Sequence, residues 1–234
     1  MKTLTLLAAV LVTGTLGAQS SAVQAEKRVQ LFGEFSRPRQ FTLAQPNGDV
    51  KDQAASQLGS GLRFMGELPG TTNWFFEFGG KLDSSSRLGF NQTIPMTGGP
   101  ALAINSTDVA IKYSYWEIGG AYLWDLGAGT SLGAHLDLRS ETISAQGQLV
   151  VQPSSYTGGG TVDQRGTMMR PWLRFSADFS FKMSSVNPYI GAEVAFTPIR
   201  NSQNSVVPLV GLDDRTLKAM APQFGAGIYV GLRF

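Results

Sequence analysis

The sequence predicts an all-β protein, an eight-stranded antiparallel barrel whose strands follow one another in up-and-down order. Eight segments alternate between apolar and polar or small side chains for about ten residues each, a usual length for a barrel strand. Few segments show the period of about 3.6 residues that marks an amphipathic helix. Fourteen Phe, 6 Tyr and 4 Trp are mixed with 28 Gly. Short and long connections between the segments alternate, as expected for a closed meander.

The first 25 residues predict a cleaved signal peptide. Lys2 precedes an apolar run from Leu4 to Val12, and Val23-Gln24-Ala25 fits the small-x-small pattern before a signal-peptidase site. A run of this length does not cross a bilayer as a helix, which takes about 20 residues. We therefore expect a signal peptide at 1–25 and one barrel domain at 26–234.

The predicted strands begin and end with the alternation, and residues typical of turns and loops separate them. Their predicted ranges are 28–37, 57–68, 73–83, 109–124, 130–145, 169–182, 188–199 and 221–234.

The connections predict an orientation. Three of them, near 69–72, 125–129 and 184–187, are short turns. Long loops count against a compact soluble domain, but a membrane barrel has short periplasmic turns and long extracellular loops. We therefore expect both termini and the short turns in the periplasm. The four long extracellular loops are predicted at 38–56, 84–108, 146–168 and 200–220.

Strand parity separates an apolar face from a polar one. In 169–182, for example, Leu173 and Phe175 oppose Arg174 and Asp178. The apolar face is nearly unbroken around the eight strands, and the other face carries charges of both signs in similar number. We therefore predict a transmembrane barrel with lipid outside and paired ions inside. The predicted interior network contains Glu34, Arg63, Glu67, Glu77, Lys81, Glu117, Asp137, Arg139, Glu141, Arg174, Asp178, Lys182 and Glu193.

The segment 109–124 does not fit a single parity. From Val109 to Tyr115 the odd positions are apolar, which suggests that they face lipid, whereas from Trp116 onward the even positions are apolar. We expect the strand to project above the membrane before residue 113, and a β-bulge near Tyr115 is the alternative. Trp74, Tyr122 and Trp124 are expected near the periplasmic rim of the barrel, where aromatic girdles lie.

The chain ends on an aromatic residue that completes an alternating segment, 224–234. This ending, the signal peptide, the eight strands and the alternating loop lengths together resemble the small OmpA-, OmpX- and opacity-protein-like barrels of the bacterial outer membrane. The resemblance implies that the C-terminal strand is a recognition signal for the barrel-insertion machinery. The residues implied in this signal are Ile228, Val230, Leu232 and Phe234.

The resemblance also implies a location and a role. The chain would be a non-enzymatic barrel in the outer membrane of a Gram-negative bacterium, secreted through the inner membrane. Its partners would be outer-membrane lipid and lipopolysaccharide, the insertion machinery and an unknown extracellular ligand. The expected role is loop display for adhesion or interaction, or support of envelope integrity. A narrow channel for ions or small solutes is the alternative, and a lipid-modifying hydrolase is a further one.

The composition offers little for other chemistry. The chain has no Cys and one His, too few for a zinc site with nitrogen and sulfur ligands, and we expect neither metal nor cofactor. Nineteen Lys and Arg against 17 Asp and Glu leave no basic surface for nucleic acid. Gly129 to Gly133 matches a Gly-x-Ser-x-Gly pattern, but it enters a strand, not the strand-to-helix elbow of a hydrolase. We expect Ser131 not to be a nucleophile and His135 to be an interior hydrogen-bonding residue.

Overall fold

The structure, a computed structural model, describes most of the predicted barrel domain. Residues 1–24, where the signal peptide is predicted, lie outside the described residues. Within the described part, no helix is long and apolar enough to cross a membrane. The described ranges are 25–37, 42–43, 50–51, 53–54, 56–94, 102–152, 160–183, 186–199, 217–218 and 220–234.

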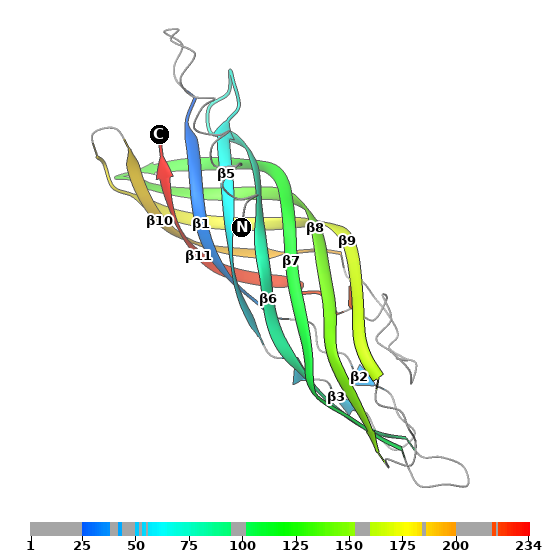
Figure 1. The fold of residues 1–234 in the computed structure, drawn as a ribbon. Helices are drawn as coiled ribbons and strands as arrows, with labels where there is room; N and C mark the ends of the chain where they lie inside the picture. Colours follow the sequence, from blue (N-terminus) through cyan, green and yellow to red (C-terminus); the bar gives the residue numbers. More distant parts are fainter. Residues whose placement is uncertain are drawn as a thin grey trace, which may run out of the picture.

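Eight strands form one closed antiparallel barrel, as the sequence predicts (Figure 1). Each strand pairs with the next along the barrel, and pairing of the last with the first closes it. Two short strands, β2 (Thr42–Leu43) and β3 (Val50–Lys51), pair with each other, and β4 (Gln53–Ala54) pairs with β6. The barrel strands are β1 (Lys27–Ser36), β5 (Gln57–Glu67), β6 (Trp74–Ile94), β7 (Leu102–Gly127), β8 (Thr130–Gln152), β9 (Gly160–Ser180), β10 (Asn187–Phe196) and β11 (Phe224–Arg233).

The two ends of the barrel differ. The turn end carries the three short connections and the C-terminus, and the extended end carries the far ends of β6 to β9 (Figure 1). At the turn end, Phe234 donates its backbone N–H to Lys27 O at 3.0 Å and accepts one from Lys27 N at 2.9 Å. The last residue therefore takes part in the pairing that closes the barrel. In the β7–β8 turn, Gly127, Ala128 and Gly129 all have positive φ, which suits glycine at two of the three positions.

The four strands from β6 to β9 are longer than predicted. Residues 84–94, 102–108, 146–152 and 160–168 were predicted to be loop and are strand. Their outward side chains are polar on the parts that can be described, so the apolar alternation that located the other strands is missing. In these parts β7 and β8 pair on both sides, whereas β6 and β9 pair mainly with β7 and β8 on one side. Backbone pairing therefore extends the strands without an apolar outer face.

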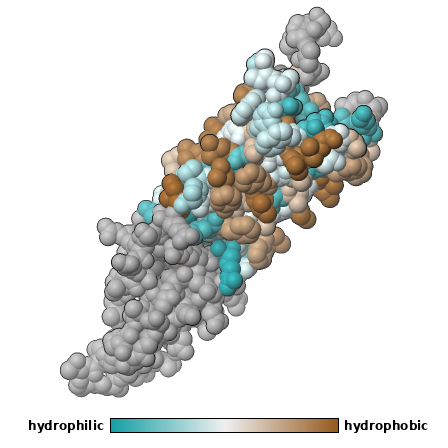
Figure 2. Space-filling model, turned by 180° about the vertical axis from the view of Figure 1, so that it is seen from behind, coloured by the Kyte–Doolittle hydropathy of each residue, from teal (hydrophilic) through white to brown (hydrophobic). Residues whose placement is uncertain are grey.

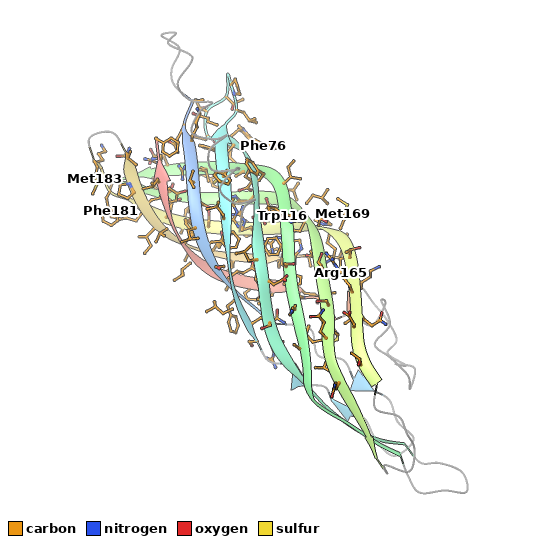
Figure 3. All side chains as sticks on the ribbon, viewed as in Figure 1. Phe76, Trp116, Arg165, Met169, Phe181 and Met183 are labelled. Carbon is orange, nitrogen blue, oxygen red and sulfur yellow. The ribbon has the colours of Figure 1, made fainter. Side chains whose placement is uncertain are left out.

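Apolar side chains cover the outer wall next to the turn end. Figure 2 shows many of them on one face of the barrel, and Figure 3 labels Phe76, Trp116 and Met169 among them. Phe76, Phe175 and Val194 are 42, 48 and 44% exposed, whereas Glu77 and Arg174 are 0% exposed. Trp74, Tyr122 and Trp124 form edge-to-face pairs close to the turn end. The outer wall becomes polar between Trp116 and the extended end. The first row of outward side chains there contains Ser114, Thr142 and Thr167.

Strand β7 keeps one parity along its described side chains. Val109, Ile111, Tyr113 and Tyr115 all point inward and are at most 2% exposed, so these odd positions do not face lipid, contrary to what their apolar character suggests. Pairing with β8 is continuous from Ala110 to Asp125, without the bulge considered near Tyr115. The irregularity lies instead on β6, between Lys81 and Ser84. The apolar odd positions are explained by an apolar interior at the extended end, which sequence parity alone does not distinguish from a lipid-facing wall.

The interior has three zones along the barrel axis. Near the turn end, Met65, Phe75, Ala121 and Leu123 form a small apolar cluster. Charged side chains fill the middle. A second apolar cluster reaches the extended end, where helical backbone brings in residues from the β10–β11 connection. This second cluster contains Leu217, Met220 and Ala221 of the connection. It also contains Val109 and Ile111 on β7 and Ile143 and Ala145 on β8.

We expect a glycine pair to report on the packing of the strands. A Cβ at Gly79 would lie 2.7 Å from Leu62 O and 3.1 Å from the Arg63 Cβ, whereas a Cβ at Gly33 would meet nothing within 4 Å. Gly79→Ala should therefore lower the free energy of unfolding by about 1–3 kcal/mol through overpacking. Gly33→Ala should leave it unchanged or raise it by up to about 1 kcal/mol. Equilibrium denaturant unfolding measures both, and equal effects would contradict this packing.

Candidate functional site

The charged middle of the interior is the candidate site. Alternation turns every second side chain of each strand inward, so a residue such as Glu77 on β6 meets Arg174 on β9 across the barrel. Within the described part, six cations and seven carboxylates are buried there, a nearly balanced set. The cations are Arg28, Arg63, Lys81, Arg139, Arg170 and Arg174, and the carboxylates are Glu34, Glu77, Glu117, Asp137, Glu141, Asp178 and Glu193.

Arg174 joins carboxylates from three other strands. Its guanidinium donates to Glu77 on β6 at 2.6 Å, to Asp137 on β8 at 3.2 Å and to Glu193 on β10 at 3.1 Å. All four side chains are at most 2% exposed. A buried charge is tolerated only when it is paired and hydrogen-bonded, and three acceptors match the donor-rich guanidinium.

A second set of pairs continues from this centre. Arg63 donates to Glu193 at 3.0 Å and to Glu117 at 2.7 Å, and Arg139 donates to the other oxygen of Glu117 at 2.9 Å. Glu193 therefore links Arg63 to Arg174, and the two sets form one network. Arg139 also lies between two aromatic rings, 4.0 Å from the centroid of Tyr115 and 4.3 Å from that of Trp172. Desolvated stacking of this kind adds cation–π attraction to the ion pairs.

Glu34 connects the network to β1. It accepts hydrogen bonds from Lys81 at 3.1 Å and from the Tyr115 hydroxyl at 2.7 Å, and it lies 3.4 Å from Arg139. Lys81 also donates to the Ser36 hydroxyl at 2.9 Å. Side chains from β1, β6, β7 and β8 thus meet at one carboxylate.

Polar pairs also lie at the two margins of the network. Toward the turn end, Asp178 accepts from Arg28 at 3.2 Å and from the Ser131 hydroxyl at 2.6 Å. Toward the extended end, Glu141 accepts from Arg170 at 2.7 Å and from the Trp172 indole at 2.5 Å. The charged zone therefore spans the interior from one apolar cluster to the other.

Two residues of the predicted network lie apart from it. Glu67 is near the turn end and accepts backbone N–H groups of Glu26 at 3.1 Å and Asn73 at 3.3 Å. Lys182 follows the last residue of β9 and is exposed. The other predicted members are buried inside the barrel, and each forms at least one ion pair there.

The prediction omitted Arg170 and the aromatic partners of the cations. Arg170 has the same parity as Arg174, so the alternation of β9 would have placed it inside. The stacking of Arg139 between Tyr115 and Trp172 had no comparable signal, because it depends on how β7 and β9 face each other through the interior.

Ser131 and His135, the residues of the hydrolase-like pattern, do not contact each other through a hydrogen bond. His135 instead bonds Ser176 Oγ through Nε2 at 2.9 Å and Glu77 through Nδ1 at 3.0 Å. This order of groups resembles a catalytic triad. However, Glu77 is also held by Arg174, all three side chains are at most 9% exposed, and the strand backbone around Ser176 is paired on both sides. A nucleophile needs room for its substrate and free N–H donors for an oxyanion, and the site offers neither.

The described residues contain no group of three or more His, Asp or Glu side chains that could hold a metal ion. Arg174 pairs with Glu77, Asp137 and Glu193, so the three carboxylates share one guanidinium. The arrangement suits internal charge compensation and rigid packing.

Comparison with solved structures identifies the fold. OprG, an outer membrane protein from Pseudomonas aeruginosa, matches with a TM-score of 0.50 and 10% identity, over 90% of this chain and 96% of that chain. Neisserial surface protein A matches with a TM-score of 0.44 and 10% identity, over 88% and 95% of the two chains. Ail of Yersinia pestis, solved with a heparin analogue, matches with a TM-score of 0.42 and 14% identity, over 91% and 100%. No family model and no curated protein matches the chain.

The chain therefore has the fold of the small eight-stranded outer-membrane barrels. The match to OprG and the closed antiparallel sheet establish this, in agreement with the resemblance seen in the sequence. Identities of 10 to 14% concern the fold alone, so the role of the chain must be argued from its own residues.

We expect Arg174 to be central to stability. Arg174→Met should lower the free energy of unfolding by at least about 3–5 kcal/mol, because it leaves buried carboxylates without their partner. Lys182→Met is the matched control, since Lys182 is exposed, and it should change the value by less than about 0.5 kcal/mol. Denaturant unfolding followed by tryptophan fluorescence measures both variants. A similar effect of the two substitutions would contradict the assignment of Arg174 to a paired interior.

Proposed function

We propose that the chain is a non-enzymatic barrel of the outer membrane of a Gram-negative bacterium. In this proposal it displays its extended end outside the cell for adhesion or interaction, or supports envelope integrity. Residues 1–25 would direct its export and be removed. The main observation behind this proposal is that side chains are distributed opposite to those of a soluble protein. Large apolar groups lie on the outer wall, and charges lie inside.

The apolar side chains of the outer wall argue for contact with lipid. Phe76, Phe175 and Val194 stand on three different strands and are each more than 40% exposed, and other large apolar side chains surround the barrel between them. A soluble monomer rarely exposes a continuous apolar patch of more than a few hundred Å², because water solvates it poorly. Hydrocarbon solvates such a surface well, and a closed barrel leaves no unpaired strand edge within it.

The ends of the barrel support the proposed orientation. Outer-membrane barrels keep short turns in the periplasm and extend on the extracellular side, which corresponds to the turn end and the extended end here. The outward positions Ile228, Val230, Leu232 and Phe234 are 46 to 69% exposed, so their side chains are accessible to the insertion machinery in our proposal. The apolar wall would contact membrane lipid. The polar wall between Trp116 and the extended end would face lipopolysaccharide.

The filled interior favours display over conduction. Arg63, Arg139 and Arg174 are fully buried in the middle of the barrel, and each pairs with carboxylates from other strands. An ion that crossed this zone would have to displace several desolvated pairs at once. In contrast, β6 to β9 extend well beyond the apolar wall, and the outward side chains that the structure describes there are mainly polar.

We expect a charge on the outer wall to be costly only where lipid covers it. Ala192→Arg, in the middle of the outward positions of β10, should lower the free energy of unfolding from phospholipid vesicles by about 2–4 kcal/mol. Ser144→Arg, on the polar wall of β8, should lower it by no more than about 1 kcal/mol. Urea unfolding in vesicles measures the difference. A protein that stays folded and monomeric without detergent or lipid would overturn the membrane assignment.

The channel alternative gives a separate prediction. We expect the purified protein in planar bilayers to show no reproducible conductance steps, because the buried pairs of Arg174 close the interior. Neutralising Glu77 or Arg174 serves as the diagnostic comparison. Steps in the unmodified protein that change amplitude in either variant would favour a narrow pore over display.

A further inference from the structure

The β10–β11 connection sends a short segment into the barrel. We call Leu217, Lys218, Met220, Ala221 and Pro222 the plug segment. Leu217 and Met220 are 0% exposed and Ala221 is 1% exposed. They join one buried cluster with residues of the extended end of the interior, among them Val109 and Ile111 on β7 and Ile143 and Ala145 on β8.

We propose that the plug segment is a displaceable closure of the extended end, latched to the barrel wall by Arg170. It separates the charged middle of the interior from the solvent at that end. The proposal concerns the interior and does not depend on the location or the display role proposed above.

The backbone of the plug segment can leave without breaking the barrel. Its described residues have helical geometry or no regular structure, and Ala221 N donates to Lys218 O at 3.3 Å within the segment itself. The strands, in contrast, are held by continuous backbone pairing. That pairing ends where Thr197 N donates to Gln223 O at 3.1 Å, just beyond the plug segment. Side-chain packing therefore accounts for much of its attachment, and such elements open locally more easily than paired strands.

Arg170 provides a polar latch that tolerates opening. Its Nη2 donates to Pro222 O at 2.7 Å, and the same guanidinium pairs with Glu141 on β8 at 2.6 Å. Glu141 also accepts from Trp172 Nε1 and from the Tyr113 hydroxyl. Displacing the plug segment breaks the bond from Arg170 to Pro222 O, whereas Arg170 and Glu141 remain paired. Opening therefore leaves neither Arg170 nor Glu141 as a buried charge without a partner, which would be costly.

The closure isolates a layer that would otherwise be wet. Glu141, Arg170 and Trp172 lie at the margin of the charged zone. The cluster that contains Leu217 and Met220 lies next to them, on the side of the extended end. Water that entered at the extended end would reach these ion pairs and weaken them, since their attraction is stronger in a dry interior. The plug segment thus controls both access to the interior and the strength of its outermost pairs.

The absence of cysteine from the sequence allows a direct test. Ala145→Cys places a thiol among the residues that the plug segment covers, and Gln146→Cys places one at the next position, which is exposed on the outer wall. Ala121→Cys is a second control, because Ala121 is buried in the cluster near the turn end. Each full-length variant is folded in detergent micelles and treated with a charged thiol reagent that does not enter micelles.

We expect slow labelling of Ala145→Cys that is nevertheless faster than global unfolding of the same variant. Adding Met220→Ser should accelerate it about a hundredfold, because truncating a fully buried methionine favours the open state by about that factor. Arg170→Lys, which retains the charge but not the fork of donors, should accelerate it to a lesser extent. Labelling of Gln146→Cys and Ala121→Cys should not change in either background.

Three results would overturn the proposal. Labelling of Ala145→Cys at the rate of global unfolding would make the plug segment a permanent part of the core. An unchanged rate after Met220→Ser, with the fold retained, would show that another element closes this end. Equal acceleration of Ala121→Cys would show general loosening of the barrel. If Met220→Ser does not fold, Leu217→Ser provides the same comparison, since Leu217 is equally buried.

Discussion

Closure of the sheet is the constraint on which the rest of the structure depends. β1 and β11 pair from Arg28 and Arg233 to Ser36 and Gly225, and this seam closes the wall over the part of the barrel that all eight strands share. Once the wall is closed, each strand position belongs either to the interior or to the outer surface, because side chains alternate. Arg174 and Phe175 are neighbours in the chain, yet one is fully buried among carboxylates and the other is 48% exposed on the outer wall. The same closure lets the terminal Phe234 present its side chain outward while its backbone is held by Lys27.

The interior combines a charged middle with apolar ends, and these zones have different physical roles. The pairs around Arg174 and Glu117 join many strands, so movement of one strand would separate several charges at once. Such a network is a weak source of net stability, because desolvation opposes the attraction, but we expect it to disfavour registers that would leave these charges unpaired. The apolar zone near Val109 and Ile143 imposes no comparable requirement, because apolar contacts can be exchanged without leaving a charge unpaired.

The sequence is sufficient to predict the strand number, the order and the inward or outward position of most side chains. Glu77, Arg174 and Glu193 were assigned to the interior by parity alone, and they lie there. The partner of each charge was not predictable, because Arg174 meets Glu77 from β6 through the relative stagger of strands that are distant in sequence. The lengths of β6 to β9 were also missed, since residues such as Ser144 and Arg165 leave the outer wall polar and remove the alternation that marks a strand. For Val109 and Ile111, apolar character suggests contact with lipid, although an apolar interior demands the same residues.

Strand β7 passes through the charged and the apolar zones of the interior, and its outer side passes from the apolar to the polar part of the wall. Its inward positions change from Ala121 through Glu117 to Val109, while its outward positions change from apolar at Trp116 to polar at Ser114. The inner and outer transitions on β7 therefore occur at about the same level. There the interior side chains of β7 and β8 become apolar, whereas Gln57 on β5 and Ser84 and Ser86 on β6 form a buried hydrogen-bonded group. In the membrane location that we propose, the apolar outer wall would contribute hydrophobic burial beside lipid, and the interior can be charged. Beyond that wall the barrel is surrounded by polar surface, and hydrophobic stabilisation must come from inside, as in a soluble protein. Leu217 and Met220 complete that inner core, so the segment that closes the barrel also supplies the apolar contacts that its extended end requires.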